Sequence, residues 1–168
     1  MQKQSNLRKM LITFCIAPIN TDMLISIAIT NFCKINNYPE FDYKIVRNIG
    51  GKPSLSPNLL QISVSHSNKI VVVAVSQQNI GIDIEYNKKL INIEKISTRF
   101  FDKPINSSKE FFDHFTLSEA TTKLTQIPLP KTMKFAEFDG KIMPFFIDFT
   151  LAIAGEDTEI AFIEYYKK

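Results

Sequence analysis

Short runs of β-branched and aromatic residues, separated by turn residues, recur along the first half of the chain and predict β-strands. The expected strands cover residues 10–16, 43–47, 60–64, 69–76 and 80–86. The run IVVVAV at residues 70–75 is almost entirely β-branched, which favours a strand in the interior of a sheet. After the first strand, apolar residues recur at helical spacing and predict a helix from Thr21 or Asp22 to about Asn36.

The pattern changes after residue 86, where helical periodicity comes first and strand patterns follow. One helix is expected over residues 91–101. A second begins at Ser107 or Ser108 and runs to about Gln126, with a break near Asp113. Three further strands are expected over residues 134–138, 146–154 and 159–165.

This order of elements predicts an α+β fold built from two halves, residues 1–86 and residues 87–168. Each half is expected to be an antiparallel sheet with helix on one face. The halves would be related by a pseudo-twofold axis and packed as one compact unit, with the active site between them.

Charge and cysteine content exclude several classes of protein. The net charge of +3 is small and scattered, and no basic run is interleaved with aromatic residues, so nucleic-acid binding is not expected. Cys15 and Cys33 match neither a disulfide framework nor a zinc site. We expect both to be free thiols in a reducing cytoplasm.

The apolar run that starts at Met10 follows basic residues, as in a secretory leader, but no small-residue cleavage site comes after it. Pro18, Asn20 and Asp22 interrupt the run well short of the ~20 residues that a membrane span requires. A first strand is therefore expected here, and no association with a membrane.

The stretch IGIDIEYNKK, which begins at Ile80, places two carboxylates in a hydrophobic strand. Strand side chains alternate between faces, so Asp83 and Glu85 project to one side while the isoleucines project to the other. Two neighbouring carboxylates repel each other unless a cation lies between them, and Mg²⁺ prefers such oxygen ligands. Gly81 would allow another backbone or a ligand to come close. The ordinary alternative is the solvent-facing side of a sheet.

Three other segments carry side chains suited to phosphate chemistry. In FTLSEATTK, Glu119 and Lys123 share a helix face, where they would form either an ion pair or a carboxylate and an amine of a site. His66, in SVSHS, is placed at a hairpin tip and could donate to a phosphate. Lys52, in GGKPSL, could meet another phosphate. A surface histidine and an exposed turn lysine are the ordinary alternatives for these last two.

The order G-K-P, S-H-S, G-I-D-I-E and F-T-x-x-E-A-x-x-K resembles the signatures of the two-halved 4′-phosphopantetheinyl transferases of the surfactin-synthetase type. The resemblance extends from about Asp22 to Gln126 and includes the segment RFF that ends at Phe101. Such enzymes move the phosphopantetheine arm of coenzyme A to a serine of an apo carrier protein and release 3′,5′-adenosine bisphosphate.

By this resemblance, Asp83, Glu85 and Glu119 would hold Mg²⁺, with Mn²⁺ as a possible substitute. Glu119 would also be the base for the incoming serine, and Lys123 would contact the phosphates. His66 would contact the pyrophosphate of coenzyme A.

The resemblance also implies that Lys52 contacts the 3′-phosphate end of coenzyme A. The partner would be an apo acyl, polyketide or peptidyl carrier protein, and the sequence does not select among them. Because the metal motif lies in mid-chain, both halves come from one polypeptide and a monomer is expected. This position also excludes the smaller, trimeric type of carrier-protein synthase, in which the motif lies near the N-terminus.

The chain departs from the family pattern in three places. Phe115 stands where the family has tryptophan, and Ser118 stands where it has lysine. The interval of about residues 17–20 is short and lacks the family's basic segment, which predicts a weaker grip on coenzyme A or one that uses Lys52 with Arg8 or Lys9.

These departures motivate an alternative, a degenerate relative that binds carrier protein or coenzyme A without catalysis. A further alternative is a structural α/β domain whose sequence resembles the family motifs by coincidence.

Overall fold

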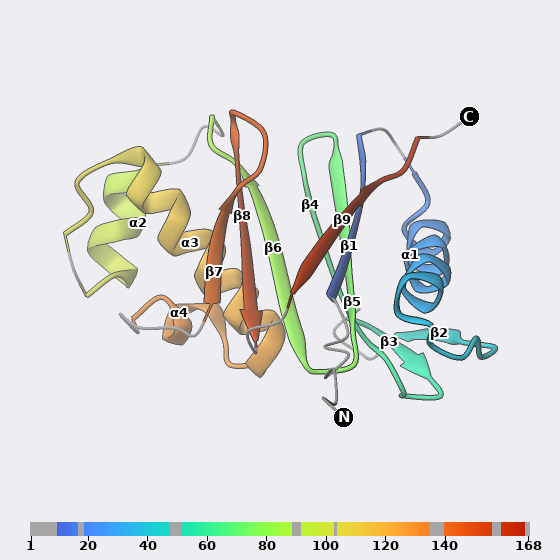
Figure 1. The fold of residues 1–168 in the computed structure, drawn as a ribbon. Helices are drawn as coiled ribbons and strands as arrows, with labels where there is room; N and C mark the ends of the chain where they lie inside the picture. The colour runs from blue at the N-terminus through green and yellow to red at the C-terminus, as the bar shows by residue number, and fades with distance from the viewer. Residues whose placement is uncertain are drawn as a thin grey trace, which may run out of the picture.

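Two β-sheets lie face to face in the centre of the molecule, with helix α1 outside one and helix α3 outside the other (Figure 1). This computed structural model describes residues 10–16, 19–47, 52–88, 92–102, 104–134, 140–155 and 159–166. The mixture of helices and sheets is the α+β class that the sequence predicts. Within the described residues, no helix is long and apolar enough to cross a membrane.

The first sheet has four strands in the spatial order β4-β5-β1-β9. Their bounds are Gln61–Ser67 for β4, Ile70–Ser76 for β5, Met10–Ile16 for β1 and Ile160–Glu164 for β9. Strand β5 is internal, as its β-branched sequence predicts. Strand β1 pairs antiparallel with β5 and parallel with β9, so this sheet is mixed rather than purely antiparallel.

The second sheet has three antiparallel strands in the order β6-β8-β7. Their bounds are Ile80–Tyr86 for β6, Phe149–Gly155 for β8 and Gly140–Pro144 for β7. A small separate ladder joins β2 (Lys44–Arg47) to β3 (Pro53–Ser56). Strand β3 lies in a segment for which the sequence pattern predicts a polar loop and not a strand.

The helices are α1 (Thr21–Asn36), α2 (Ile93–Phe100), α3 (Ser108–Thr125) and the single turn α4 (Leu129–Thr132). Asn20, rather than Thr21 or Asp22, caps α1, since its side chain accepts from the backbone N–H groups of Asp22 and Met23. Ser107 caps α3 as predicted. Helix α3 is continuous through Asp113, so the predicted break is wrong.

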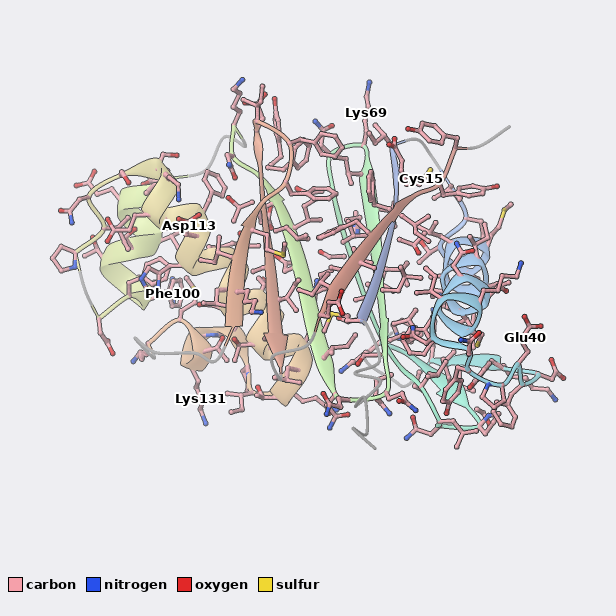
Figure 2. The ribbon with its side chains drawn as sticks, viewed as in Figure 1. Cys15, Glu40, Lys69, Phe100, Asp113 and Lys131 are labelled. Carbon is pink, nitrogen blue, oxygen red and sulfur yellow. The ribbon has the colours of Figure 1, made fainter. Side chains whose placement is uncertain are left out.

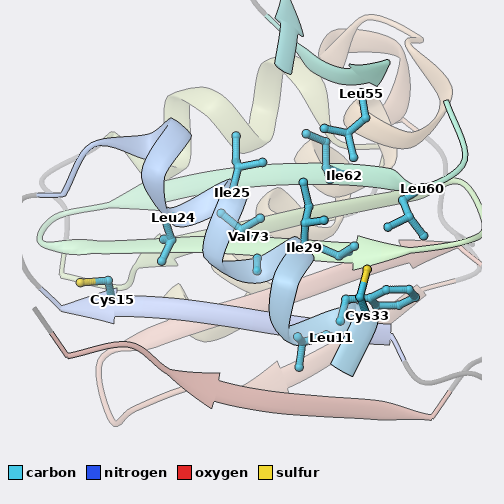
Figure 3. Packing of buried hydrophobic residues seen from close by; sticks show 13 residues of the cluster. Leu11, Cys15, Leu24, Ile25, Ile29, Cys33, Leu55, Leu60, Ile62 and Val73 are labelled. Carbon is cyan, nitrogen blue, oxygen red and sulfur yellow. The ribbon is translucent and has the colours of Figure 1, made fainter. Parts of the chain in front are cut away.

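The period-two alternation of the strands divides the core into layers. Odd-numbered residues of β1 and β5, such as Leu11 and Val73, pack against the buried face of α1 (Figure 3). Even-numbered residues of the same strands, such as Ile12 and Val72, pack against Ile82 and its neighbours in the second sheet. The strands β1 and β5 are therefore buried on both faces, which agrees with their nearly continuous apolar sequences.

The sheets divide the chain differently from the predicted halves. The predicted boundary at residue 86 assigns β6 to the first half, but β6 belongs to the sheet of β7 and β8. Strand β9 comes from the other half and returns to pair with β1. The strand predicted over residues 134–138 lies, apart from Lys134, outside the described residues.

Gly81 is the point at which α3 touches β6. A Cβ atom added to Gly81 would lie 1.9 Å from the carbonyl oxygen of Ala120 and 2.8 Å from the backbone nitrogen of Leu124. The expectation that Gly81 admits another backbone is thus confirmed. Because both obstacles are main-chain atoms, a side chain cannot be accommodated by a rotamer change.

We expect Gly81→Ala to lower the free energy of unfolding by about 3 kcal/mol or more, since overpacking against rigid neighbours is costly. Urea denaturation followed by circular dichroism measures this change. Ser54→Ala, in the exposed part of β3, is the control and should stay within about 0.5 kcal/mol of the unmodified protein. An equally small effect of Gly81→Ala would contradict the close packing of α3 on β6.

Candidate functional site

A row of three serines on β4 joins the two sheets. The backbone N–H groups of Ile82, Ile84 and Tyr86 donate to the hydroxyls of Ser63, Ser65 and Ser67, at 3.0, 3.3 and 2.9 Å. Each bond spans 19 residues, so β4 and β6 run in the same direction. We call this row the serine ladder.

The serine ladder provides hydrogen-bond acceptors for the backbone N–H groups at the buried outer edge of β6, which within the described residues has no neighbouring strand in its own sheet on that side. Strand β6 is the outer strand of its sheet and β4 is the outer strand of the other sheet. Unpaired N–H groups in a buried edge are costly, and here side-chain hydroxyls accept from them instead of carbonyl groups. All three serines are buried. The alternation S-x-S-x-S in a strand of a buried sheet is the sequence signal for this contact.

The ladder also reaches the two carboxylates of the GIDIE segment. The Ser65 hydroxyl donates to Oδ1 of Asp83 at 2.6 Å, and the Ser67 hydroxyl donates to Oε2 of Glu85 at 3.3 Å. The position that corresponds to Ser63 on this face of β6 is Gly81, which has no side chain. Two serines of the ladder, Ser65 and Ser67, therefore donate to a carboxylate, and Ser63 does not.

Asp83 is the most constrained acid of the site. Its Oδ1 atom accepts from Ser65 and also from the ammonium of Lys123, whose Nζ lies 2.7 Å away. Its Oδ2 atom is buried and has no hydrogen-bond partner. A buried carboxylate oxygen without a partner is costly and marks a position where an additional cation or donor would be stabilising.

Lys52, from the segment just before β3, contacts the same network through Lys123. Its ammonium donates to the main-chain carbonyl oxygen of Lys123, in the last turn of α3. Helix carbonyl groups at this end have no partner within the helix, so Lys52 acts as a cap for α3. Burial and the nearby charge of Lys123 lower the pKa of Lys52. The ammonium of Lys52 is thus close enough to that of Lys123 for their charges to interact, and Lys123 in turn pairs with Asp83.

A polar pocket of about 330 Å³ extends from Lys52 between segments that are far apart in the sequence. Amide residues contribute to its lining from the loop before β4, from the first residue of β4, from the turn before β6 and from the end of α3. These are Asn58, Gln61, Asn79 and Gln126. A larger pocket of about 650 Å³ lies between α2 and the start of α3, and its lining begins at Ile93 and ends at Ser108. The smaller pocket is the one continuous with the Lys52 network.

The three acids predicted to hold a metal differ in their surroundings. Asp83 fits a ligand role through its unpartnered Oδ2 atom, and Glu85 projects from the same face of β6. Glu119 lies one helical turn before Lys123 on α3 and is half-buried. As the side chains stand, no three histidine, cysteine or carboxylate groups of the described residues are close enough to hold a metal ion. The set Asp83, Glu85 and Glu119 stays a prediction.

His66 points away from the serine ladder. It lies within β4, and because Ser67 pairs with Ile70 the turn of the hairpin is Asn68-Lys69 rather than His66-Ser67-Asn68. Figure 2 labels Lys69 at this turn. Residues of β4 alternate, so His66 shares the face of Ile62, which packs toward α1, and it is exposed. Its predicted contact with a pyrophosphate stays a prediction, because His66 lies on the face of β4 opposite to the serines that bond Asp83 and Glu85.

The two motif departures on α3 lie in packed surroundings. Ser118 is fully buried, and its hydroxyl donates to the carbonyl oxygen of His114 at 2.8 Å. A lysine at this position would have to bury its ammonium group, so serine suits the packing here. The ring of Phe115 stacks on Phe111 with centroids 5.6 Å apart. The short connection between β1 and α1 is also confirmed, since β1 ends at Ile16 and α1 begins at Thr21.

No model of a known protein family matches the sequence, and no curated protein matches it.

We expect Lys123→Met to lower the free energy of unfolding by about 2 kcal/mol, because it leaves the buried Asp83 carboxylate without its cation in a pair that water screens only partly. Adding Asp83→Asn should recover part of this loss, and the double-mutant cycle measured by urea denaturation gives the coupling. Lys109→Met removes the exposed partner of Asp113 on the same helix and should change stability by at most about 0.5 kcal/mol. Equal effects of Lys123→Met and Lys109→Met would contradict a buried ion pair at Asp83.

Proposed function

We propose that the protein transfers the 4′-phosphopantetheine arm of coenzyme A to a serine of an apo carrier protein, in a Mg²⁺-dependent reaction. The observation that carries this proposal is the connection of four motif segments into one network. Hydrogen bonds run from Lys52 to the main-chain carbonyl of Lys123, and from the Lys123 ammonium and the Ser65 hydroxyl to Asp83. The four segments joined in this way are G-K-P (Lys52), S-H-S (Ser65), G-I-D-I-E (Asp83) and E-A-x-x-K (Lys123). Chance similarity in four separate short motifs gives no reason for them to meet.

The layered architecture supports the same proposal. One helix covers each sheet, α1 on the first and α3 on the second, and the network lies where β4 of one sheet meets β6 of the other. An arrangement of two helix-covered sheets with the chemistry at their junction is what the proposed transferase fold requires. The pseudo-twofold relation between the two halves is part of the proposal.

In the proposed reaction, the carrier serine attacks the β-phosphate of coenzyme A and the bond to 3′,5′-adenosine bisphosphate breaks. Glu119 takes the proton of the serine hydroxyl. Lys123, held at its position by Asp83, donates to the phosphate oxygens on which negative charge develops. Lys52 binds the phosphate at the far end of the coenzyme from its position at the end of α3.

Asp83, Glu85 and Glu119 would hold the Mg²⁺, and the unpartnered Oδ2 of Asp83 is the atom that supports this assignment. An Mg²⁺ ion held by these residues would supply positive charge that stabilises the negative charge developing on the phosphoryl oxygens. Two acids on one strand face and a third on the helix that packs on that strand provide oxygen ligands of the kind that Mg²⁺ prefers.

A second candidate function is binding of carrier protein or coenzyme A without transfer. The contact between Lys123 and Asp83 favours it, because the ammonium occupies an oxygen of a predicted metal ligand. The two candidates differ in whether a covalent product forms.

We expect an apo carrier protein to gain the mass of phosphopantetheine when it is incubated with this protein, coenzyme A and Mg²⁺. A panel of fatty-acid, polyketide and peptide-synthetase carriers should be examined by intact-protein mass spectrometry. Asp83→Asn should slow the transfer by about 100-fold or more, since a ligand charge and the partner of Lys123 are both lost.

Asp148→Asn is the matched control, because Asp148 is a partly exposed acid whose ion-pair partner is Lys88. It should retain the activity of the unmodified protein. If every carrier stays unmodified while some carriers or coenzyme A bind, the binding function is favoured. If nothing binds and nothing is modified, both candidate functions are wrong.

A further inference from the structure

The serine ladder has a second consequence, which concerns the orientation of the carboxylates. Ser65 accepts from the N–H of Ile84 and donates to Oδ1 of Asp83, so one hydroxyl is fixed by the backbone of β6 and in turn fixes a side chain of β6. Ser67 makes the same pair of bonds, to the N–H of Tyr86 and to Glu85. The serines that flank His66 in S-H-S thus have geometric roles, which the sequence motif alone does not assign.

The two donors to Asp83 converge on the same oxygen. Ser65 and Lys123 both bond Oδ1, at 2.6 and 2.7 Å, and Oδ2 has no partner although Asp83 is only 4 % exposed. A carboxylate can accept about four hydrogen bonds, so two donors on Oδ1 set the orientation of the carboxylate plane and leave the buried Oδ2 atom without a donor. Rotation of the side chain would cost both bonds.

We propose that Ser65 is a positioning residue that holds Asp83 so that its Oδ2 atom is presented to a divalent cation, and that Ser67 supports Glu85 in the same manner. This inference rests on the proposed function, in which Asp83 and Glu85 bind Mg²⁺. Groups that orient metal ligands by hydrogen bonding typically contribute about 10–100-fold to metal affinity. Strand β4, in the first sheet, thereby controls the ligands of a site in the second sheet.

The ladder contains its own control. Ser63 accepts from the N–H of Ile82 at 3.0 Å, as the other two serines do from their own partners, but the facing position is Gly81. Ser63→Ala and Ser65→Ala therefore each leave one buried N–H group without its acceptor and should destabilise the protein by similar amounts from that cause. Only Ser65→Ala also removes a donor from a carboxylate.

The experiment is a titration of the full chain with Mn²⁺ as the probe, in which electron paramagnetic resonance counts free ion without any need for activity. The unmodified protein and Ser63→Ala should bind with the same affinity. Ser65→Ala should bind about 10–100-fold more weakly. Ser67→Ala should show a smaller loss, because its bond to Glu85 is longer; it provides a second measurement if Ser65→Ala does not fold.

Equal affinities of Ser63→Ala, Ser65→Ala and Ser67→Ala would overturn the positioning role, even if carrier proteins still gain phosphopantetheine. Failure of the unmodified protein to bind Mn²⁺ would overturn it as well. Neither result would decide the transferase proposal, because that proposal is judged by the mass gain of the carrier. The two proposals therefore fail by different observations.

Discussion

The bonds from the buried edge of β6 to the serine ladder are the interaction on which the rest of the structure depends. Two outer strands of different sheets, β4 and β6, meet there. Hydroxyl groups accept from Ile82, Ile84 and Tyr86, and the sheets remain packed face to face across Ile82 and Val72. Without these acceptors, three N–H groups would be left without their partners at the junction of the two sheets.

The opposite face of β6 is constrained by α3. At Gly81 the backbone of Ala120 and Leu124 lies against the strand, and two strand residues further on the ammonium of Lys123 reaches Asp83. Lys52 then caps the same helix from the N-terminal part of the chain. The position of α3 is consequently fixed by a close backbone contact and an ion pair, both from β6, and by a cap from Lys52, which lies just before β3. Such a site is built on rigid elements, which suits a reaction that depends on placing charges rather than on covalent catalysis.

Much of the local structure could be predicted because it depends on short-range patterns. The strands β1, β5 and β6, the helix α1 and the start of α3 at its Ser107 cap follow from periodicity and capping residues. The close approach at Gly81 was also predictable, since a glycine in a buried strand leaves space for another backbone. The predicted assignment of strands to two halves failed because it depends on long-range pairing: β9 returns to β1 and β6 joins β8, which no local pattern specifies. The break predicted near Asp113 is a local prediction that is wrong. The surroundings of His66 were also not predictable from the sequence pattern. They depend on whether the hairpin turn begins at His66 or two residues later, which decides whether His66 lies in the turn or on one face of β4.

The sequence by itself determined that Asp83 and Glu85 share a face of one strand, that Glu119 and Lys123 share a face of one helix, and that three serines alternate along another strand. These relations follow from the fixed periods of strand and helix. Only the tertiary structure decided which faces meet. It placed Lys123 on Asp83, Lys52 on the end of α3 and the serines on the edge of β6, because these contacts join segments that are 18 to 71 residues apart. The pairing of such distant segments is set by the packing of the whole core, which no window of the sequence contains.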